Sequence, residues 1–300
     1  MNKYIKFLVD PFYRFSVLTS RGVYDDMSDE KFLRKKYKLA FKKDLDLENP
    51  KTFTDKLQWL KLYDRNPVYT TMVDKYEAKN YVAGIIGKEH IIPTIAICDN
   101  FDDIDFGLLP EKFVLKCTHN SGGLVVCKNK SELNMEVARE RLTNALNVNY
   151  YLRSREWPYK NVKPRIIVEK YMEECGGDDL IDYKFYCFNG EPKFLYISQG
   201  LANHATARIN FVTLNWEKAE FKRDDFAEFE TLPPKPLNFD KMIEFSKKLS
   251  QNIPFLRVDF YNIGGHIYFS ELTFFPGAGF TPFNPNVWNY KIGEYIKLPR

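Results

Sequence analysis

The chain has 300 residues, and its 44% hydrophobic and 16% aromatic content supplies enough apolar surface for one large domain or two smaller ones, which argues against a disordered chain. Charged residues make up 28% of the chain and leave a net charge of only +4, so we expect no nucleic-acid partner. Five scattered cysteines without a C-x-x-C pair disfavour a disulfide framework and a zinc site, and indicate a reducing cytoplasm.

The N-terminal segment mixes apolar and basic side chains. It lacks the apolar stretch of a secretion signal, and no run in the chain reaches a bilayer-spanning length. Its apolar positions are Tyr4, Phe7, Leu8, Phe12, Phe15 and Leu18. The interleaved lysines and arginines would let the segment lie on an anionic membrane surface. We expect it instead to dock on the protein core, because aromatic stripes usually pack.

Three helices are expected before the first strand. The first covers residues 28–41, with Ser28 as its cap. The second begins near residue 54 and ends near the chain-breaking pair Asn66-Pro67, and the third covers residues 74–82. Short β-type runs then follow at residues 91–92, 95–97, 113–115 and 124–126.

The rest of the chain alternates strands with two helices. Strands are expected at residues 165–169, 183–188, 256–261 and 266–272, and helices at residues 131–147 and 239–251. The Asn189-Gly190 pair predicts a hairpin turn. Strand-rich stretches with interposed helices indicate an α+β fold.

A phosphate clamp is suggested where Lys116 ends an apolar strand and a polar glycine loop follows. The loop consists of Asn120, Ser121, Gly122 and Gly123. Glycines let backbone N–H groups approach phosphate oxygens, and the lysine ammonium offsets their charge. The string is not a Walker A loop, since Gly-Lys-Ser/Thr and a following helix are missing. A Ser-Gly-Gly turn between strands is more often an ordinary hairpin.

Two carboxylates, Asp259 and Glu271, lie on otherwise apolar strands and would meet if those strands pair. Acidic side chains that face a core need a positive partner, and Mg²⁺ bridging nucleotide phosphates is one. Alternatively, both face solvent, or Arg257 pairs with one of them. Serine and cysteine hydrolases are disfavoured because G-x-S-x-G is absent, and we expect His119 to structure its loop by a hydrogen bond rather than to catalyse.

Taken in order, these strings resemble the ATP-grasp superfamily and, within it, the TupA-like proteins of teichuronopeptide and other bacterial surface-polysaccharide synthesis. The strings that look like signatures of that group are residues 49–59, Asp74-Lys75-Tyr76 and residues 155–160. The resemblance runs from Asn49 to the C-terminus. It implies an α+β ATP-grasp fold with ATP between two lobes. It also implies a first lobe at 71–170 with the glycine loop and a second lobe at 171–300 with the magnesium site. ATP-grasp enzymes typically begin with a Rossmann-like domain, but the patterns here are helical, so we expect a helical N-terminal region at 1–70 in its place.

The resemblance also implies a nucleotide site. Lys75 and Lys116 match the lysines that contact the ATP phosphates, and the loop from Asn120 to Gly123 matches the one that closes over them. The positions that resemble the hinge strand holding adenine are Glu169, Lys170, Tyr171 and Met172. Asp182 is expected to hold the ribose, and Lys184 to add a phosphate contact.

The magnesium and catalytic residues are implied in the same way. Arg257-Val258-Asp259 looks like the Arg-hydrophobic-Asp of D-alanine–D-alanine ligase, where the aspartate holds magnesium and the arginine steadies the acyl phosphate. Glu271 matches a second magnesium ligand, and Thr273 stands where that ligase pattern, Glu-x-Asn, has asparagine. Arg257 and Lys116 are thus the expected catalytic residues.

The implied activity is that of an ATP-dependent carboxylate–amine ligase acting through an acyl phosphate. The TupA-like context implies a uronic acid in a glycan or sugar nucleotide as the carboxylate, and an amino acid or amino sugar as the amine. We expect a cytoplasmic protein, with peripheral contact to the inner face of the membrane or to polysaccharide-assembly enzymes left open.

Basic side chains could form a cationic surface for such a substrate, although a solvated basic face is the simpler interpretation. They are Arg153, Arg155, Lys160, Lys163, Arg165 and Arg208. One alternative is a glycosyltransferase-type enzyme that uses a sugar nucleotide, with Trp157, Trp216 and Trp288 stacking on sugar rings. Another is a nucleotide-binding scaffold without turnover, suggested by Thr273.

Overall fold

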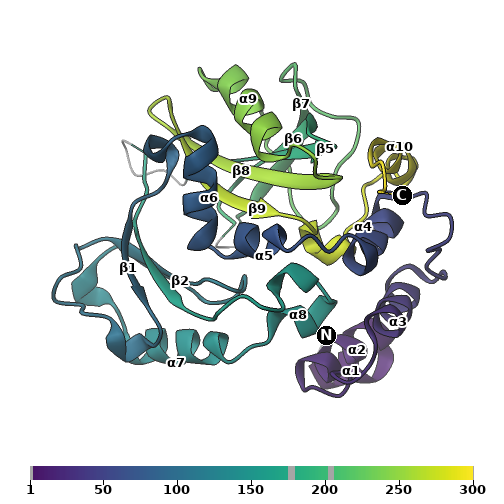
Figure 1. Ribbon diagram of the computed structural model, residues 1–300, viewed down its shortest axis with the longest axis horizontal. Helices are drawn as coiled ribbons and strands as arrows, with labels where there is room; N and C mark the ends of the chain where they lie inside the picture. Colours follow the sequence, from purple (N-terminus) through teal and green to yellow (C-terminus); the bar gives the residue numbers. More distant parts are fainter. Residues whose placement is uncertain (1–2, 175–179, 202–205, 300) are drawn as a thin grey trace.

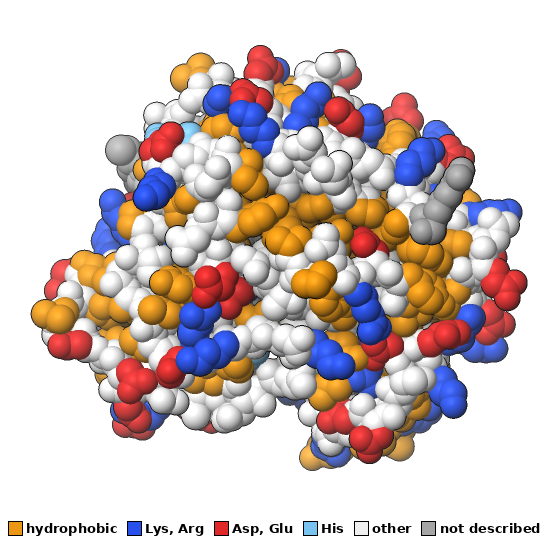
Figure 2. All heavy atoms as spheres, viewed as in Figure 1, with side chains coloured by type: hydrophobic (Ala, Val, Ile, Leu, Met, Phe, Trp, Pro, Cys, Tyr) orange, Lys and Arg blue, Asp and Glu red, His pale blue; other side chains and the backbone are white. Residues whose placement is uncertain are grey.

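The computed structural model describes residues 3–174, 180–201 and 206–299. They form an α+β fold with two antiparallel sheets and a helical N-terminal region, which confirms the predicted fold class (Figure 1). No helix in these ranges is long and apolar enough to cross a bilayer. The four cysteines within them are free, and Cys175 lies outside them. Figure 2 shows basic, acidic and apolar side chains intermixed over the face drawn.

The N-terminal helical region consists of α1 (Lys3–Val9), α2 (Pro11–Ser20) and α3 (Asp29–Phe41). The prediction that this segment docks on the core is confirmed for α2, which buries Phe15, and wrong for α1, which buries no side chain. The reason is that α1 packs along α2 and leaves Ile5, Leu8 and Val9 exposed to solvent. Ser28 precedes α3 as predicted, but its side chain makes no capping hydrogen bond.

Three helices follow, namely α4 (Phe53–Tyr63), α5 (Val68–Val73) and α6 (Glu77–Ile86). Thr52 and Asp55 form a capping box that begins α4. The predicted third helix starts three residues late, because Asp74 has an extended backbone and its carboxylate accepts from the N–H groups of Tyr76 and Glu77. The chain break at Asn66-Pro67 is followed directly by α5, which sequence patterning missed.

The first sheet has the order β1-β4-β2-β3. Its members are β1 (Thr94–Cys98), β2 (Phe113–Cys117), β3 (Leu124–Cys127) and β4 (Ile166–Lys170). The predicted run at residues 91–92 is not a strand, since Ile91 makes only an isolated bridge to Phe269. The helices between β3 and β4 are α7 (Met135–Leu146) and α8 (Tyr150–Ser154). α7 starts later than predicted because Asn134 caps it.

The second sheet has the order β7-β6-β5-β8-β9. Its members are β5 (Asp182–Phe188), β6 (Glu191–Gln199), β7 (Arg208–Thr213), β8 (Phe255–Ile263) and β9 (His266–Thr273). The helices are α9 (Phe239–Leu249) and α10 (Val287–Tyr295). The hairpin predicted at Asn189-Gly190 joins β5 to β6, and both turn residues have positive φ. Asp259 and Glu271 lie opposite each other on β8 and β9.

The hydrophobic clusters do not follow the order of the chain. Leu57 of α4 and Val82 of α6 share one cluster with Phe185 and Phe260 of the second sheet. The first sheet and α7 form a separate cluster, and α2 and α3 form a third. The first sheet is therefore an insertion between two parts of the second lobe. The boundaries at residues 70 and 170 stay predictions.

Candidate functional site

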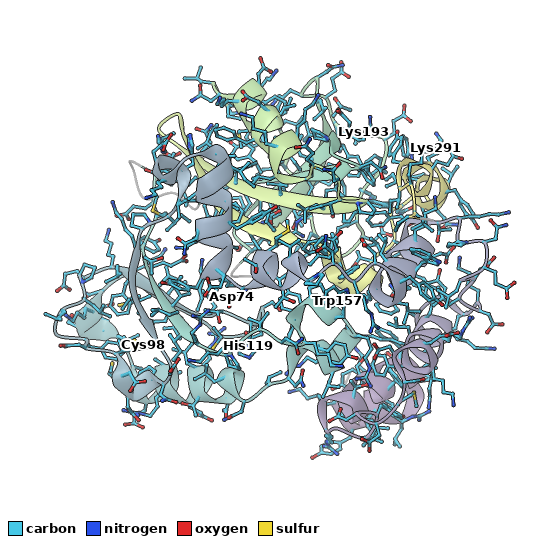
Figure 3. The ribbon with its side chains drawn as sticks, in the orientation of Figure 1. Asp74, Cys98, His119, Trp157, Lys193 and Lys291 are labelled. Carbon is cyan, nitrogen blue, oxygen red and sulfur yellow. The ribbon has the colours of Figure 1, made fainter. Side chains whose placement is uncertain are left out.

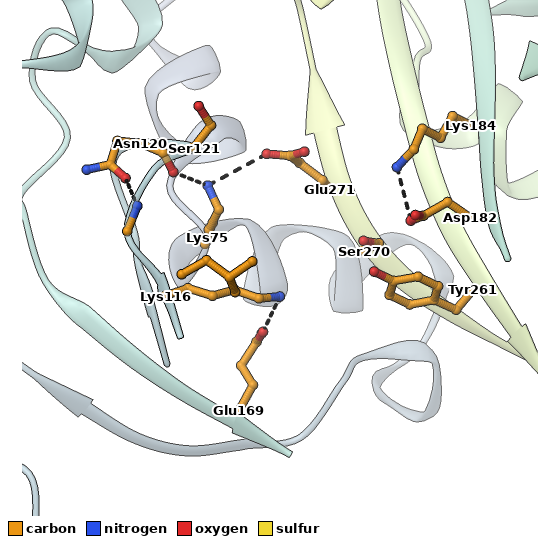
Figure 4. Close-up of a pocket in the computed structure, with 12 residues that line it drawn as sticks. Lys75, Lys116, Asn120, Ser121, Glu169, Asp182, Lys184, Tyr261, Ser270 and Glu271 are labelled. Carbon is orange, nitrogen blue, oxygen red and sulfur yellow. Dashed lines mark hydrogen bonds and ion pairs between the residues drawn. The ribbon is translucent and has the colours of Figure 1, made fainter. Parts of the chain in front are cut away.

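A pocket of about 220 Å³ lies between the two sheets (Figure 4). Its lining comes from both lobes and consists of Lys75, Lys116, Asn120, Ser121, Gly123, Leu124, Glu169, Asp182, Lys184, Tyr261, Ser270 and Glu271. Most of the predicted nucleotide-site residues thus meet in one place. The predicted site residues that do not line it are Gly122, Lys170, Tyr171, Met172, Arg257, Asp259 and Thr273.

Lys75 connects the two lobes at this pocket. It lies between α5 and α6, and its backbone N–H donates to Thr118 O at 3.1 Å. Its ammonium donates to Asn120 O at 2.7 Å and lies 3.6 Å from the Glu271 carboxylate (Figure 4). A phosphate that enters the pocket would find this cation already between the glycine loop and β9.

Glu169 is a buried carboxylate held by two lysines. Lys116 Nζ lies 2.7 Å from one carboxylate oxygen, and Lys79 of α6 pairs with the other. Burial alone would raise the pKa of Glu169, but the two ammonium groups outweigh it and lower that pKa. Lys79 was not predicted, and no local pattern marks it, because its partner lies 90 positions away on β4. The side chain of Glu169 is thus engaged with lysines.

The glycine loop is organised by Asn120. The side-chain oxygen of Asn120 accepts from the N–H groups of Gly122 and Gly123 at 3.1 and 3.0 Å. Both N–H groups are therefore bonded within the loop, and the Asn120 side chain fixes its turn. Ser121 Oγ donates to the Tyr150 hydroxyl at 3.1 Å. His119 Nε2 bonds Val148 O at 3.1 Å, which agrees with the loop-structuring role expected for this histidine (Figure 3).

Asp259 is fully buried, and both of its oxygens are occupied by cations. Arg257 donates through Nε and Nη2 at 2.7 and 2.6 Å, and Lys184 donates at 3.0 Å. Burial would raise the pKa of Asp259, but Arg257 and Lys184 hold it below its ordinary value. Lys184 also lies 3.0 Å from Asp182 Oδ1. Pairing with Arg257 is one of the alternatives that the sequence left open.

The predicted magnesium ligands fit the ion unequally. Glu271 lines the pocket with a side chain that is 36% exposed, and its nearest cations, Lys75 and Arg257, are 3.6 and 3.8 Å away. This carboxylate is available to Mg²⁺. Asp259 would first have to leave Arg257 or Lys184, and Thr273 Oγ1 accepts from Arg257 at 2.9 Å. Across residues 3–174, 180–201 and 206–299, no cluster of three metal-binding side chains is preformed. The metal roles of Asp259 and Thr273 stay predictions.

Several other predicted residues lie apart from the pocket. Lys170, Tyr171 and Met172 end or follow β4 and do not line it, so their adenine contacts stay predictions. Arg155 does not belong to a substrate-facing surface, because it is buried and donates to the carbonyls of Tyr24 and Met27. The three tryptophans proposed to stack on sugars are partly buried and pack against the core.

Three lining residues, Leu124, Tyr261 and Ser270, were missed from the sequence. A signal existed for Tyr261, which follows Asp259 by two residues on the same strand and therefore shares its face. The Asp182 carboxylate and burial raise the pKa of Tyr261 to about 12, so its hydroxyl stays protonated and can donate a hydrogen bond into the pocket.

Several solved structures of ligases resemble this chain. The D-alanine–D-alanine ligase from Bacillus anthracis, solved with ATP, has a TM-score of 0.38 and 16% identity, over 67% of this chain and 54% of that ligase. The Helicobacter pylori D-alanine–D-alanine ligase has a TM-score of 0.42 and 17% identity, over 82% of this chain and 69% of that one. The ATP-grasp ligase PsnB, solved with Mg and ADP, has a TM-score of 0.41 and 8% identity, over 85% of this chain and 65% of PsnB. This chain thus spans only part of each. No curated protein matches the chain.

The family is shown by the sequence itself. The sequence model of the TupA-like ATPgrasp family matches residues 55–297, which is most of the chain and close to the extent inferred from the motifs. ATP-grasp proteins typically use ATP and Mg²⁺. The lysines and the glycine loop of the pocket fit a nucleotide phosphate, and Glu271 fits a magnesium contact. The protein belongs to the TupA-like ATP-grasp family.

Proposed function

We propose that the protein joins a carboxylate to an amine with the energy of ATP, through an acyl phosphate. The observation that carries the proposal is the pocket in which Lys75, Lys116 and the glycine loop of one lobe face Lys184 and Glu271 of the other. Three ammonium groups suit a triphosphate, and such fixed charges stabilise phosphoryl transfer without reorganisation. Bound Mg²⁺ would add charge neutralisation at the phosphates.

Two arginines, Arg257 and Arg153, are placed to bind the carboxylate substrate. Arg257 lies within 3.8 Å of Glu271 and would stabilise negative charge on the carboxylate as it accepts the phosphoryl group. Exposed Arg153 lines a second pocket beside the glycine loop, together with Ser121 and Tyr150. It is the best placed of the predicted basic residues to bind an acidic sugar. With family membership, this supports a uronic acid of a bacterial surface polysaccharide, or its precursor, as the carboxylate, and an amino acid or amino sugar as the amine.

The first test is nucleotide binding. Thermal unfolding would be measured with ATP, ADP, UDP-glucose and GDP-mannose, each with Mg²⁺, for wild type, Asp259→Asn and the surface control Asp99→Asn. A ligand that binds only the folded state raises the midpoint. We expect a shift with ATP or ADP that weakens in Asp259→Asn and persists in Asp99→Asn, whose carboxylate pairs with exposed Lys163. A shift with sugar nucleotides alone would replace the ligase by the glycosyltransferase-type alternative.

A further inference from the structure

The carboxylate of Glu156 is buried but accepts no hydrogen bond from the residues that the structure describes. Glu156 precedes a short 3-10 turn at Trp157–Tyr159 and is only 5% exposed. Within the described part of the chain, its side chain makes no hydrogen bond and no ion pair, whereas Trp157 next to it donates to Asp64 O at 3.0 Å. A buried carboxylate normally accepts hydrogen bonds, so the two oxygens of Glu156 have acceptor capacity that the described residues do not use.

Two lysines lie near Glu156 but use their protons elsewhere. Lys61 donates to Gln58 Oε1, Ser154 O and Ala278 O at 3.0, 2.9 and 2.7 Å. Lys36 donates to Arg153 O and Ser154 Oγ at 3.0 and 2.7 Å. All of these acceptors are neutral. The lysines therefore hold the turn after β9 and the end of α8, and they leave the acceptor sites of Glu156 open.

Glu156 does not line the pocket between the sheets, but two neighbouring tyrosines connect it to the glycine loop. The rings of Tyr150 and Tyr159 are 4.9 Å apart. Burial raises the pKa of both tyrosines, and the negative charges of Glu271 and Glu156 raise both further. Tyr150 in turn accepts from Ser121 of the glycine loop. A path of contacts thus leads from the phosphate loop through the two tyrosines toward Glu156.

The protonation of Glu156 is compatible with proton transfer near neutral pH. Burial raises the pKa of Glu156 to about 7, against the pull of Lys61 on α4 and Lys36 on α3, and Glu271 on β9 adds to the rise. A catalytic base works best when its pKa lies near the operating pH.

We propose that Glu156 binds the ammonium group of the amine co-substrate and takes one proton from it. This inference rests on the proposed function. The freed amine then attacks the acyl-phosphate carbon, so that a C–N bond forms, the C–O bond to phosphate breaks and inorganic phosphate leaves with the bonding electrons. The second amine proton ends on the phosphate. The open acceptor sites of Glu156 match the three donors of an ammonium group.

The test compares two nucleophiles with different need for a base. Wild type, Glu156→Gln, Glu156→Asp and the surface control Glu132→Gln would be incubated with ATP, Mg²⁺ and UDP-glucuronic acid, glucuronic acid or galacturonic acid. Each mixture would contain one of two nucleophiles. Hydroxylamine is largely unprotonated at neutral pH, whereas the nitrogen of ammonium chloride is almost entirely protonated. Hydroxamate, amide and ADP would be quantified.

We expect Glu156→Gln to lower amide formation from ammonium about 100-fold, within the usual contribution of a base, and to leave hydroxamate formation near wild type. Glu156→Asp should keep part of the amide activity, and Glu132→Gln all of it. A purely structural role would lower both products together, and that result overturns the inference. Equal amide yields in wild type and Glu156→Gln would also overturn it. The same holds if wild type makes hydroxamate but no amide. No hydroxamate from wild type would instead refute the proposed function.

Discussion

At the scale of single residues, the buried Glu169 should matter far more for stability than an exposed glutamate in a similar pair. Replacing it by glutamine leaves Lys79 and Lys116 without their shared counter-charge, and breaking a buried pair costs about 3–5 kcal/mol. Glu173 pairs with Lys112 on the surface, where the loss should stay below about 1 kcal/mol. Chemical denaturation of Glu169→Gln and Glu173→Gln measures the difference. Equal losses would contradict the arrangement of the three side chains.

The contribution of Glu169 to stability depends on pH in a defined direction. The folded pKa of Glu169 is lower than its ordinary 4.5, so the unfolded state binds the proton more readily. The contribution of Glu169 to stability is therefore complete above pH 4.5 and is lost as the pH falls through the folded pKa. We expect the stability gap between wild type and Glu169→Gln to narrow below pH 4.5.

The two loop glycines should respond differently to a methyl group. A Cβ at Gly123 would lie 2.4 Å from Cys117 Sγ and 2.8 Å from Ala145 Cβ, whereas a Cβ at Gly122 would meet nothing within 4 Å. Gly123→Ala should lower the free energy of unfolding by about 1–3 kcal/mol, as overpacked cores do. Gly122→Ala serves as the matched control and should unfold like wild type. Thermal and chemical denaturation provide the measurement, and equal stability of the two variants would argue against this packing.

Site residues that belong to short strings of strand or loop residues could be predicted from the sequence. Residues whose partners lie far away in the sequence could not. Lys116, the glycine loop and the facing pair Asp259 and Glu271 follow from short strings whose geometry is local. The surroundings of Glu156 bring together α3, α4 and the turn after β9, and no pattern in the sequence encodes that meeting.

At the scale of elements, α1 is an amphipathic helix with its apolar side in solvent. Ile5, Leu8 and Val9 are exposed, Leu8 to 70%, and lie on one side of the helix. Between residues 3 and 21 the basic residues are Lys3, Lys6, Arg14 and Arg21, against one acidic residue, Asp10. This charge complements an anionic lipid surface, and we expect α1 to bind one in the interfacial plane.

Vesicle co-sedimentation tests this expectation. The protein should bind vesicles with phosphatidylglycerol more than neutral phosphatidylcholine vesicles, and the double change Ile5→Ser with Leu8→Ser should reduce binding at least tenfold, because each buried aliphatic side chain contributes about 1.5–3 kcal/mol. Leu108→Ser is the matched control, since Leu108 is 82% exposed on another part of the surface. Unchanged binding of the double variant would exclude α1 as the contact.

The elements that the sequence predicted best are those with local signals. Asn189-Gly190 specified its hairpin because only such residues tolerate two consecutive positive φ angles. Two helix starts were shifted by polar side chains near the predicted start. Asp74 Oδ1 accepts from the N–H of Tyr76 in an extended stretch before α6, and Asn134 caps α7. The exposed position of α1 was not predictable, because apolar periodicity marks a face without saying what covers it.

At the scale of the whole molecule, the second lobe should not fold from residues 171–300 alone. Its sheet is covered by α4 and α6, which supply Leu57, Val82 and their neighbours to the shared cluster. Without them an extensive apolar face is uncovered. We expect the fragment 171–300 to bind hydrophobic dyes and to lack the cooperative denaturation of the full chain. Cooperative unfolding of this fragment would instead support a boundary at residue 170.

The insertion of the first lobe also sets an order of events during synthesis. Domains generally fold as units while the chain leaves the ribosome. Residues 94–170 can complete their own sheet early, but the helices made before them, α4 to α6, find their partner strands only after residue 182 has emerged. Ile292 and Ile296, near the end of the chain, belong to the same cluster. The nascent protein therefore exposes part of this apolar surface at least until Ile296 has emerged, and we expect chaperones that bind emerging chains to bind it during that time.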